Sequence, residues 1–137
     1  MAGGEILIIC SMAWIIIWSF IGMRNGSSHP KWLEKMGDLA KKGELHNFWS
    51  TYDGFMMKKT GHAHANCVAC VSFLVGLTMK IDMIGYSEMF LTILAIWMFA
   101  GVILEGIGTR LRIIPLSAVG SILFLTALIA SFVGLFV

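Results

Sequence analysis

Several side chains that could bind a metal or transfer a proton follow one another at the start of an apolar run. Positions 61–70 read GHAHANCVAC and place His62, His64 and Asn66 within five residues. Imidazole is a common metal ligand and exchanges protons near neutral pH. Ionisable groups inside a membrane segment are costly and are usually kept there by a function or a partner. We therefore predict a functional site where this run begins.

The two histidines fall on different sides of a regular helix. At about 100° per residue, His62 shares a face with Asn66 and Cys70, whereas His64 points the opposite way, near Thr60. A regular helix therefore cannot present both imidazoles to one metal ion from a common side. Either one histidine is a ligand and the other has a separate role, or each faces a different partner, such as a cofactor between subunits.

An acidic residue, Glu105, lies near the end of another apolar run. If the two runs are antiparallel neighbours joined near Gly85, Glu105 lies level with His64 and Asn66. The simplest alternative is that the histidines are ordinary interfacial residues and that Glu105 pairs with a nearby base. The candidate bases for that pairing are Arg110, Arg112 and Lys58.

Basic residues surround the predicted position of this cluster, namely Arg24, Lys58, Lys59, Arg110 and Arg112. An acid, imidazoles and a basic rim suit a haem, with imidazole on the iron and Arg or Lys on the propionates. They suit a hydrophobic substrate entering from lipid equally well. We take His62 and His64 as candidate metal ligands and Arg110 and Arg112 as candidate cofactor-binding residues.

Cysteine gives little additional chemistry. Cys10, Cys67 and Cys70 all lie inside apolar runs, unlike the disulfide framework of a secreted protein. A zinc site built on Cys67 and Cys70 would need two more ligands in tetrahedral geometry. We interpret the cysteines as packing residues.

The chain that must position these residues has the composition of a membrane protein. Hydrophobic residues make up 58% of its 137 residues and charged residues 13%, whereas a typical soluble domain has about a quarter charged residues. Four apolar runs, about 6–23, 62–86, 89–109 and 113–137, have the length of about 20 residues that a helix needs to cross a bilayer. We predict an all-α integral membrane four-helix bundle forming one domain over residues 1–137. The basic residues are scattered through loops and give no sign of nucleic-acid binding.

The first connection, residues 24–61, is long and amphipathic. Pro30 suits the first turn of a helix. Apolar residues follow helical spacing in two stretches, Trp32, Met36, Leu39 and Ala40, then Leu45, Phe48, Trp49, Tyr52 and Met56. This pattern predicts two short amphipathic helices that either lie on the inner leaflet or form a cap over the end of the bundle.

Lysine and arginine placement predicts the orientation. Nine of these residues lie in the first and third connections, and Lys80 alone lies near the opposite face. By the positive-inside rule both connections are cytoplasmic, with both termini outside, in the cell (inner) membrane. The leader before the first run has no basic residue, so we expect a retained span rather than a signal peptide.

Small residues recur at helical spacing in the last run, at Gly120, Ala127, Ser131 and Gly134. Such a stripe lets helices approach closely in lipid. It could serve contacts within the chain or a homo-oligomer.

Three features together resemble a known family. Residues 3–10 read GGEILIIC, a long polar connection with tryptophans follows, and a His-to-Asn motif from His62 to Asn66 opens the second span. Over nearly its whole length the chain resembles the small four-span proteins that include styrene oxide isomerase and hydroxylaminobenzene mutase-like relatives. The family's histidine lies further ahead of the asparagine, where Thr60 stands here, and Glu105 falls near its third-span tyrosine. The HAHAN run also resembles small membrane proteins distantly similar to haem-copper oxidase spans.

The resemblance implies a haem b at the cytoplasmic end, near a subunit interface of a homo-oligomer, with a trimer as one option. His62 or His64 would be the axial ligand, Asn66 would orient a substrate, and Glu105 would tune the site or position a water. Iron would act as a Lewis acid in redox-neutral isomerisation of a small hydrophobic epoxide to a carbonyl. The alternatives are an electron-transfer or quinone-linked haem subunit, or a non-enzymatic accessory subunit of a membrane complex.

Overall fold

The computed structural model describes residues 3–136, which form helices and no strands. The helices are α1 (Gly3–Ser27), α2 (His29–Lys41), α3 (Leu45–Lys80), α4 (Glu88–Leu111), α5 (Ile114–Val133) and the 3₁₀ helix η1 (Gly134–Phe136). Four segments are long and apolar enough to cross a membrane, namely α1, α3, α4, and α5 with η1. The predicted all-α multi-pass membrane fold is confirmed. The second span ends earlier than expected, because its helix stops at Lys80 and a loop leads to Glu88.

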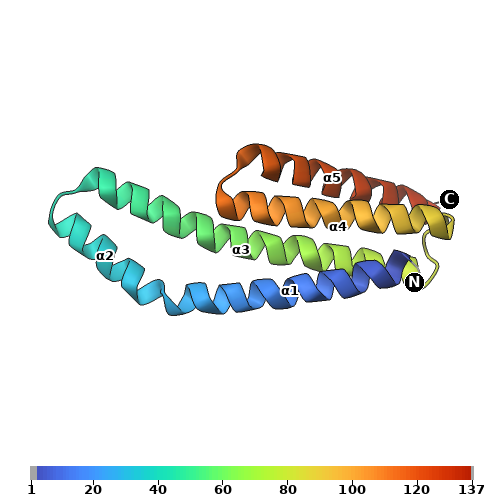
Figure 1. Ribbon diagram of the computed structural model, residues 1–137, viewed down its shortest axis with the longest axis horizontal. Coiled ribbons are helices and arrows are strands. Elements are labelled where there is room, and N and C mark those ends of the chain that lie inside the picture. The colour runs from blue at the N-terminus through green and yellow to red at the C-terminus, as the bar shows by residue number, and fades with distance from the viewer. Residues whose placement is uncertain (1–2, 137) are drawn as a thin grey trace.

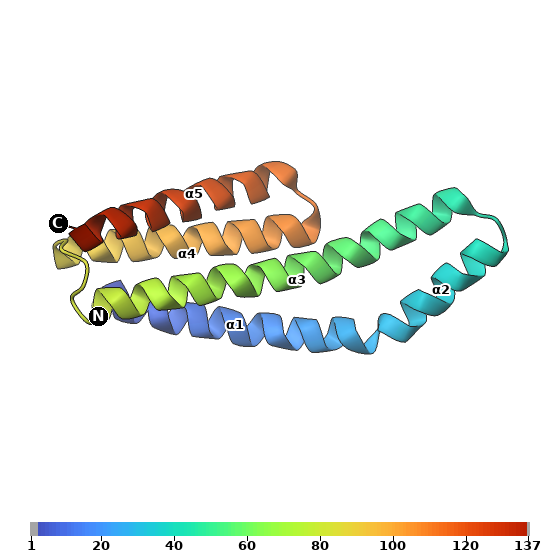
Figure 2. The same cartoon turned by 180° about the vertical axis from the view of Figure 1, so that it is seen from behind.

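The spans are arranged around α4. The helix α1 packs along α3, α4 packs against both, and α5 packs chiefly on α4 (Figures 1 and 2). The ends of α1 and α5 that carry the two termini lie at the same end of the molecule. Fully buried core side chains come from α1, α3 and α4, including Leu7, Ala69, Met98 and Val102.

The contact between α4 and α5 is a close approach of two backbones. A Cβ added at Gly120 would overlap the backbone of Glu105, and one at Gly101 would lie 2.5 Å from the backbone nitrogen of Phe124. The small residues of the predicted stripe, Gly120, Ala127, Ser131 and Gly134, are all buried. The stripe therefore packs within the chain, as small-residue interfaces do in lipid.

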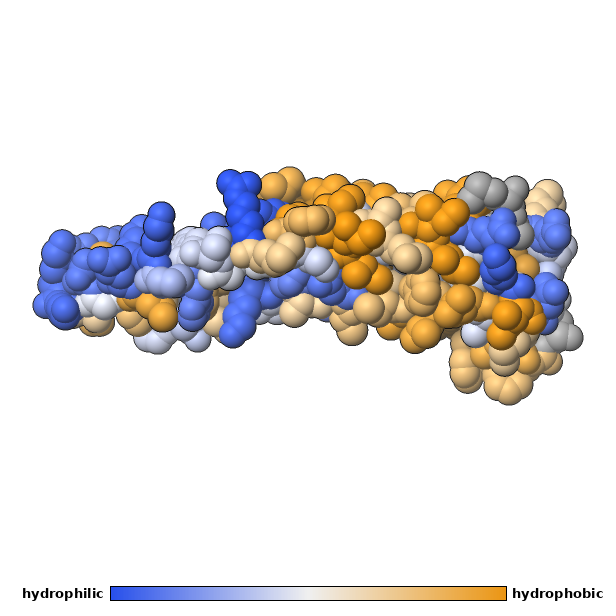
Figure 3. Space-filling model, turned by 90° about the horizontal axis from the view of Figure 1, so that it is seen from below, coloured by the Kyte–Doolittle hydropathy of each residue, from blue (hydrophilic) through white to orange (hydrophobic). Residues whose placement is uncertain are grey.

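The helix α3 is much longer than a span. Its 36 residues correspond to about 54 Å, whereas a bilayer hydrocarbon core is about 30 Å thick. Its N-terminal part extends beyond the ends of α4 and α5, and α2 packs beside it (Figure 1). We call this projection, α2 with residues 45–59 of α3, the hairpin arm. Figure 3 shows that the arm is mostly hydrophilic, whereas the surface over the bundled spans is apolar.

The hairpin arm changes one sequence-based expectation. The helix α2 forms as a separate short amphipathic helix, but the second amphipathic stretch continues without a break into the second span. Residues 45–59 continue in line with the rest of α3 (Figures 1 and 2), so they form neither a separate helix on the leaflet nor a cap over the end of the bundle. Gly54 and Gly61 lie inside the helix because they allow close contacts, with the Arg112 side chain and with Thr109 respectively. Glycine in a helix costs only about 1 kcal/mol, which such packing offsets.

Candidate functional site

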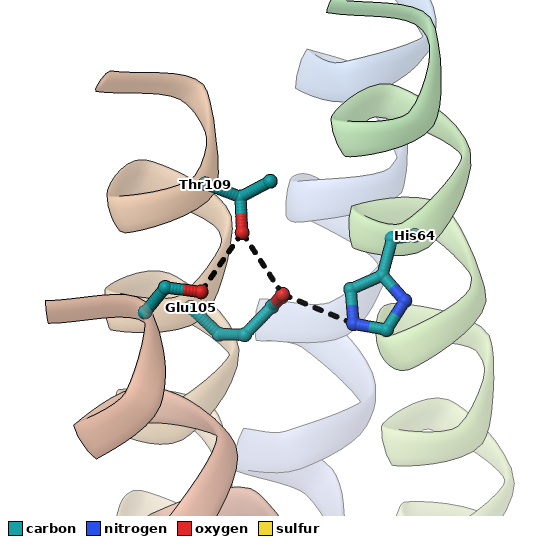
Figure 4. A network of polar contacts seen from close by, with 4 residues as sticks. His64, Glu105 and Thr109 are labelled. Carbon is teal, nitrogen blue, oxygen red and sulfur yellow. Dashed lines mark hydrogen bonds and ion pairs between the residues drawn. The ribbon is translucent and has the colours of Figure 1, made fainter. Parts of the chain in front are cut away.

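The structure brings His64 of α3 and Glu105 of α4 into direct contact. Nε2 of His64 lies 3.0 Å from Oε1 of Glu105 (Figure 4). Glu105 is 4% exposed because α5 covers it at Gly120, whereas the His64 side chain is 53% exposed. The expectation that the two residues lie at one level is confirmed. In the described part of the chain Glu105 contacts His64, and none of Arg110, Arg112 and Lys58 forms an ion pair with it.

Two hydroxyl groups extend this contact. Thr109 Oγ1 donates to Glu105 Oε1 at 3.1 Å and lies 3.0 Å from Ser117 Oγ of α5 (Figure 4). Oε2 of Glu105 is buried and has no hydrogen-bond partner among residues 3–136. Sequence reasoning missed both hydroxyls. The signal for Thr109 was its place four residues after Glu105, which puts both on one helix face. Nothing in the sequence pointed to Ser117.

The second histidine faces a different helix, as the helical spacing predicted. The His62 ring lies against Gly22 of α1, and its centroid is 6.4 Å from that of the Trp18 ring. Its Nδ1 atom is buried without a partner in the described part of the chain. His62 also lines a cavity of about 180 Å³ between α1, α2 and α3.

Asn66 follows His62 by four residues and so belongs to the α1-facing side of α3. Its Oδ1 atom is also buried with no partner within residues 3–136. Glu105 instead meets the side of α3 that carries His64. Helical spacing thus puts Asn66 on another side of α3 than the one that contacts Glu105, and a joint role of the two residues in one catalytic site stays a prediction.

The two candidate propionate ligands are also separated. The guanidinium of Arg110 lies 5.9 Å from the Trp18 ring centroid on α1. Arg112 ends α4 in a left-handed backbone conformation with φ 60°, and its side chain lies beside Gly54 of α3. Arg112 therefore lies beside the hairpin-arm part of α3, whereas the guanidinium of Arg110 lies over Trp18 and lines a cavity together with Lys58.

His64 fits the role of a metal ligand better than His62 does. Histidines that bind metals usually donate one ring N–H to a carboxylate or carbonyl and coordinate through the other nitrogen. The Nε2 side of His64 is held by Glu105, and Nδ1 lies on the far side of a half-exposed ring (Figure 4). The His62 ring is instead packed tightly against Gly22.

A haem at His64 would lie on the outer face of the chain. The cavity that His62 lines and the cavity between α3 and α5 each measure about 180 Å³, which is below the usual size of ligand sites. Lipid or a second copy of the chain would have to cover such a cofactor. A closed zinc site has no counterpart here: within residues 3–136 no three His, Cys, Asp or Glu side chains group as metal ligands, and Cys67 and Cys70 are exposed thiols.

No protein-family model, curated protein or solved structure matches this chain.

Proposed function

We propose that this protein is a membrane haem b protein that isomerises a small hydrophobic epoxide to a carbonyl compound without net redox change, and that His64 would hold the haem iron. The observation that carries the proposal is the 3.0 Å contact between His64 and the buried Glu105. A carboxylate that accepts a hydrogen bond from one ring nitrogen fixes the tautomer and makes the other nitrogen a better ligand. The resemblance to the four-span isomerase family supplies the reaction class.

The chain's own residues would hold and orient the ligand. Glu105, in contact with Nε2 of His64, would accept the N–H of that nitrogen and fix the rotation of the imidazole, while Thr109 donates to the same carboxylate oxygen and holds Glu105 in turn. Haem iron, when bound, would supply a Lewis acid for the epoxide oxygen. Arg112, on the α3 side of α4, is the candidate to pair with a propionate.

A lipid-soluble substrate would reach His64 from the side. Cys67 and Leu74 are exposed and Val71 is partly exposed on the face of α3 that carries His64. Val71 and Leu74 also line a cavity of about 180 Å³ between α3 and α5. The stretch from Cys67 to Leu74 on this face carries no charged group, so a small apolar molecule could move along it to the imidazole.

The proposal includes placement in the cell (inner) membrane. Nine of the ten lysines and arginines lie in the first and third connections, which favours a cytoplasmic hairpin arm and external termini. The exposed position of His64 favours a homo-oligomer in which a second copy covers the cofactor.

An absorption spectrum of the detergent-purified protein, with iron analysis and a haemochrome assay, tests the cofactor. We expect a Soret band and stoichiometric haem b in the wild type and in His62→Ala, and loss of haem in His64→Ala at unchanged elution volume. A wild-type protein without iron, or a His64→Ala protein with full haem, would contradict the proposal.

Conversion of styrene oxide to phenylacetaldehyde by the haem-loaded protein tests the reaction. Haem that is reduced by a quinol while the epoxide stays unchanged would instead indicate the electron-transfer alternative. Haem-free protein that co-purifies with a larger complex would indicate an accessory subunit.

A further inference from the structure

A basic pocket lies where the hairpin arm joins the spans. It measures about 410 Å³ and is formed by the end of α1, the start of α2 and side chains from α3 and α4. Its four charged lining residues are all cationic, namely Arg24, Lys31, Lys58 and Arg110. No Asp or Glu of residues 3–136 lines the pocket, and the carboxylates found in contact with a basic side chain there are Glu105, with His64, and Glu5, with Lys80.

We propose that this pocket binds the phosphodiester group of an anionic phospholipid. Four cations in one lining that contains no carboxylate attract a negatively charged group, and guanidinium groups hold phosphate oxygens through paired hydrogen bonds. Asn25, Ser27 and Ser28 add polar groups to the lining. Trp32 forms one wall and holds Lys58 in place, with the Lys58 Nζ 4.8 Å from its ring centroid.

The position of the pocket favours a lipid over a free phosphate ion. Arg24 lies in the last turn of α1 and Arg110 in the last turn of α4, so the pocket is at the ends of two spans. Phe20 and Ile17 precede Arg24 by about one and two turns, and they are 65% and 50% exposed. A lipid with its phosphate at Arg24 could lay an acyl chain along this apolar surface. Basic pockets on the cytoplasmic side of membrane helices commonly hold anionic headgroups.

This pocket is separate from the His64 site. Arg110 follows Glu105 by five residues, about 140° around α4, and its guanidinium lies over Trp18 of α1. A phospholipid in the pocket would therefore leave the His64 face of α3 free, and the proposal holds whether or not the protein binds haem.

Thermal unfolding in a neutral detergent tests the proposal, because a ligand that binds the folded state raises Tm. The purified full-length protein is titrated with phosphatidylglycerol, phosphatidylcholine or inorganic phosphate, and bound lipid is counted by native mass spectrometry. We expect phosphatidylglycerol to raise Tm by about 3 °C or more. Phosphatidylcholine and inorganic phosphate at equal concentration should have much smaller effects.

The matched variants each remove two positive charges. Arg24→Gln with Arg110→Gln should weaken phosphatidylglycerol binding by about tenfold or more, as loss of charge-assisted hydrogen bonds implies. Lys35→Gln with Lys42→Gln, outside the pocket, should bind as the wild type does. If the arginine variant does not fold, Lys31→Gln with Lys58→Gln takes its place.

Two results would overturn the proposal. An equal loss of phosphatidylglycerol binding in the pocket variant and in the control variant would show that net charge alone attracts the lipid. An equal rise in Tm with inorganic phosphate would show a site for a free anion.

Discussion

The side chain of Glu105 is buried against α5, and its Oε1 atom lies 3.0 Å from Nε2 of a half-exposed imidazole on α3, that of His64. A carboxylate removed from water needs a hydrogen-bonded or charged partner, because an uncompensated buried charge is costly. His64 and Thr109 both act on one oxygen of Glu105. The position of Glu105 under α5 therefore affects how the imidazole of His64 is oriented at the surface of the bundle.

If His64 holds a haem as proposed, replacement Glu105→Gln should weaken haem binding about 10- to 100-fold, the usual effect of losing the partner of a metal-binding histidine. The amide keeps the side chain's shape but loses the charge that favours the His64 N–H tautomer. Titration of haem into cofactor-depleted protein, followed at the Soret band, measures the change. Glu88→Gln, at the exposed start of α4, is the control and should bind as the wild type does. Wild-type affinity in Glu105→Gln would mean that the pair does not support a ligand.

Replacement Gly120→Ala should destabilise the fold by about 1–3 kcal/mol, the range for overpacking a close contact. The added methyl group would overlap the backbone of Glu105, so α5 must move away from α4. Reversible unfolding in mixed micelles measures the free energy. Gly37→Ala is the matched control, because Gly37 lies in α2 with nothing within 4 Å of an added Cβ. Gly37→Ala should leave the free energy of unfolding unchanged or raise it by up to about 1 kcal/mol. An equal fall in the free energy of unfolding in both variants would argue against the close α4–α5 contact.

Replacement Lys59→Pro should disrupt α3 where the hairpin arm meets the span, at a cost of about 3 kcal/mol. Lys59 lies inside the continuous helix Leu45–Lys80, so proline removes a hydrogen bond and clashes with the preceding turn. Hydrogen exchange of the amides around Lys59 should accelerate, whereas Lys59→Ala should leave it unchanged. Unchanged exchange in the proline variant would mean that the arm and the span are separate helices.

Much of this architecture could be predicted from the sequence. Apolar runs of membrane length gave the four spans, and helical spacing put His62 and His64 on different sides of α3. Because the connection between the second and third spans is short, the two helices have little freedom to slide along each other. Counting residues from that connection therefore placed Glu105 level with His64.

Other features depend on information that periodicity does not contain. An amphipathic pattern tells which face of a helix is apolar, but it does not tell whether two helices are fused, so the continuity of α3 was missed. The rotation of α3 against α1 and α4 depends on close contacts such as those at Gly22 and Gly61. That rotation puts Asn66 on another side of α3 than the one that contacts Glu105, which a count of depth along the helices could not reveal.

Site-directed labelling tests the orientation that the lysines and arginines predict. In a chain with Cys10, Cys67 and Cys70 replaced by alanine, Lys42→Cys places a thiol at the turn of the hairpin arm. Met83→Cys places one in the α3–α4 loop, where Met83 is 54% exposed. A membrane-impermeant maleimide should label Lys42→Cys only in inverted vesicles and Met83→Cys only in intact spheroplasts, because the positive-inside rule puts the arm in the cytoplasm. The two positions lie at opposite ends of α3, so each is the control for the other. The reverse labelling pattern would place the arm and the basic pocket outside the cell, where positively charged loops are disfavoured.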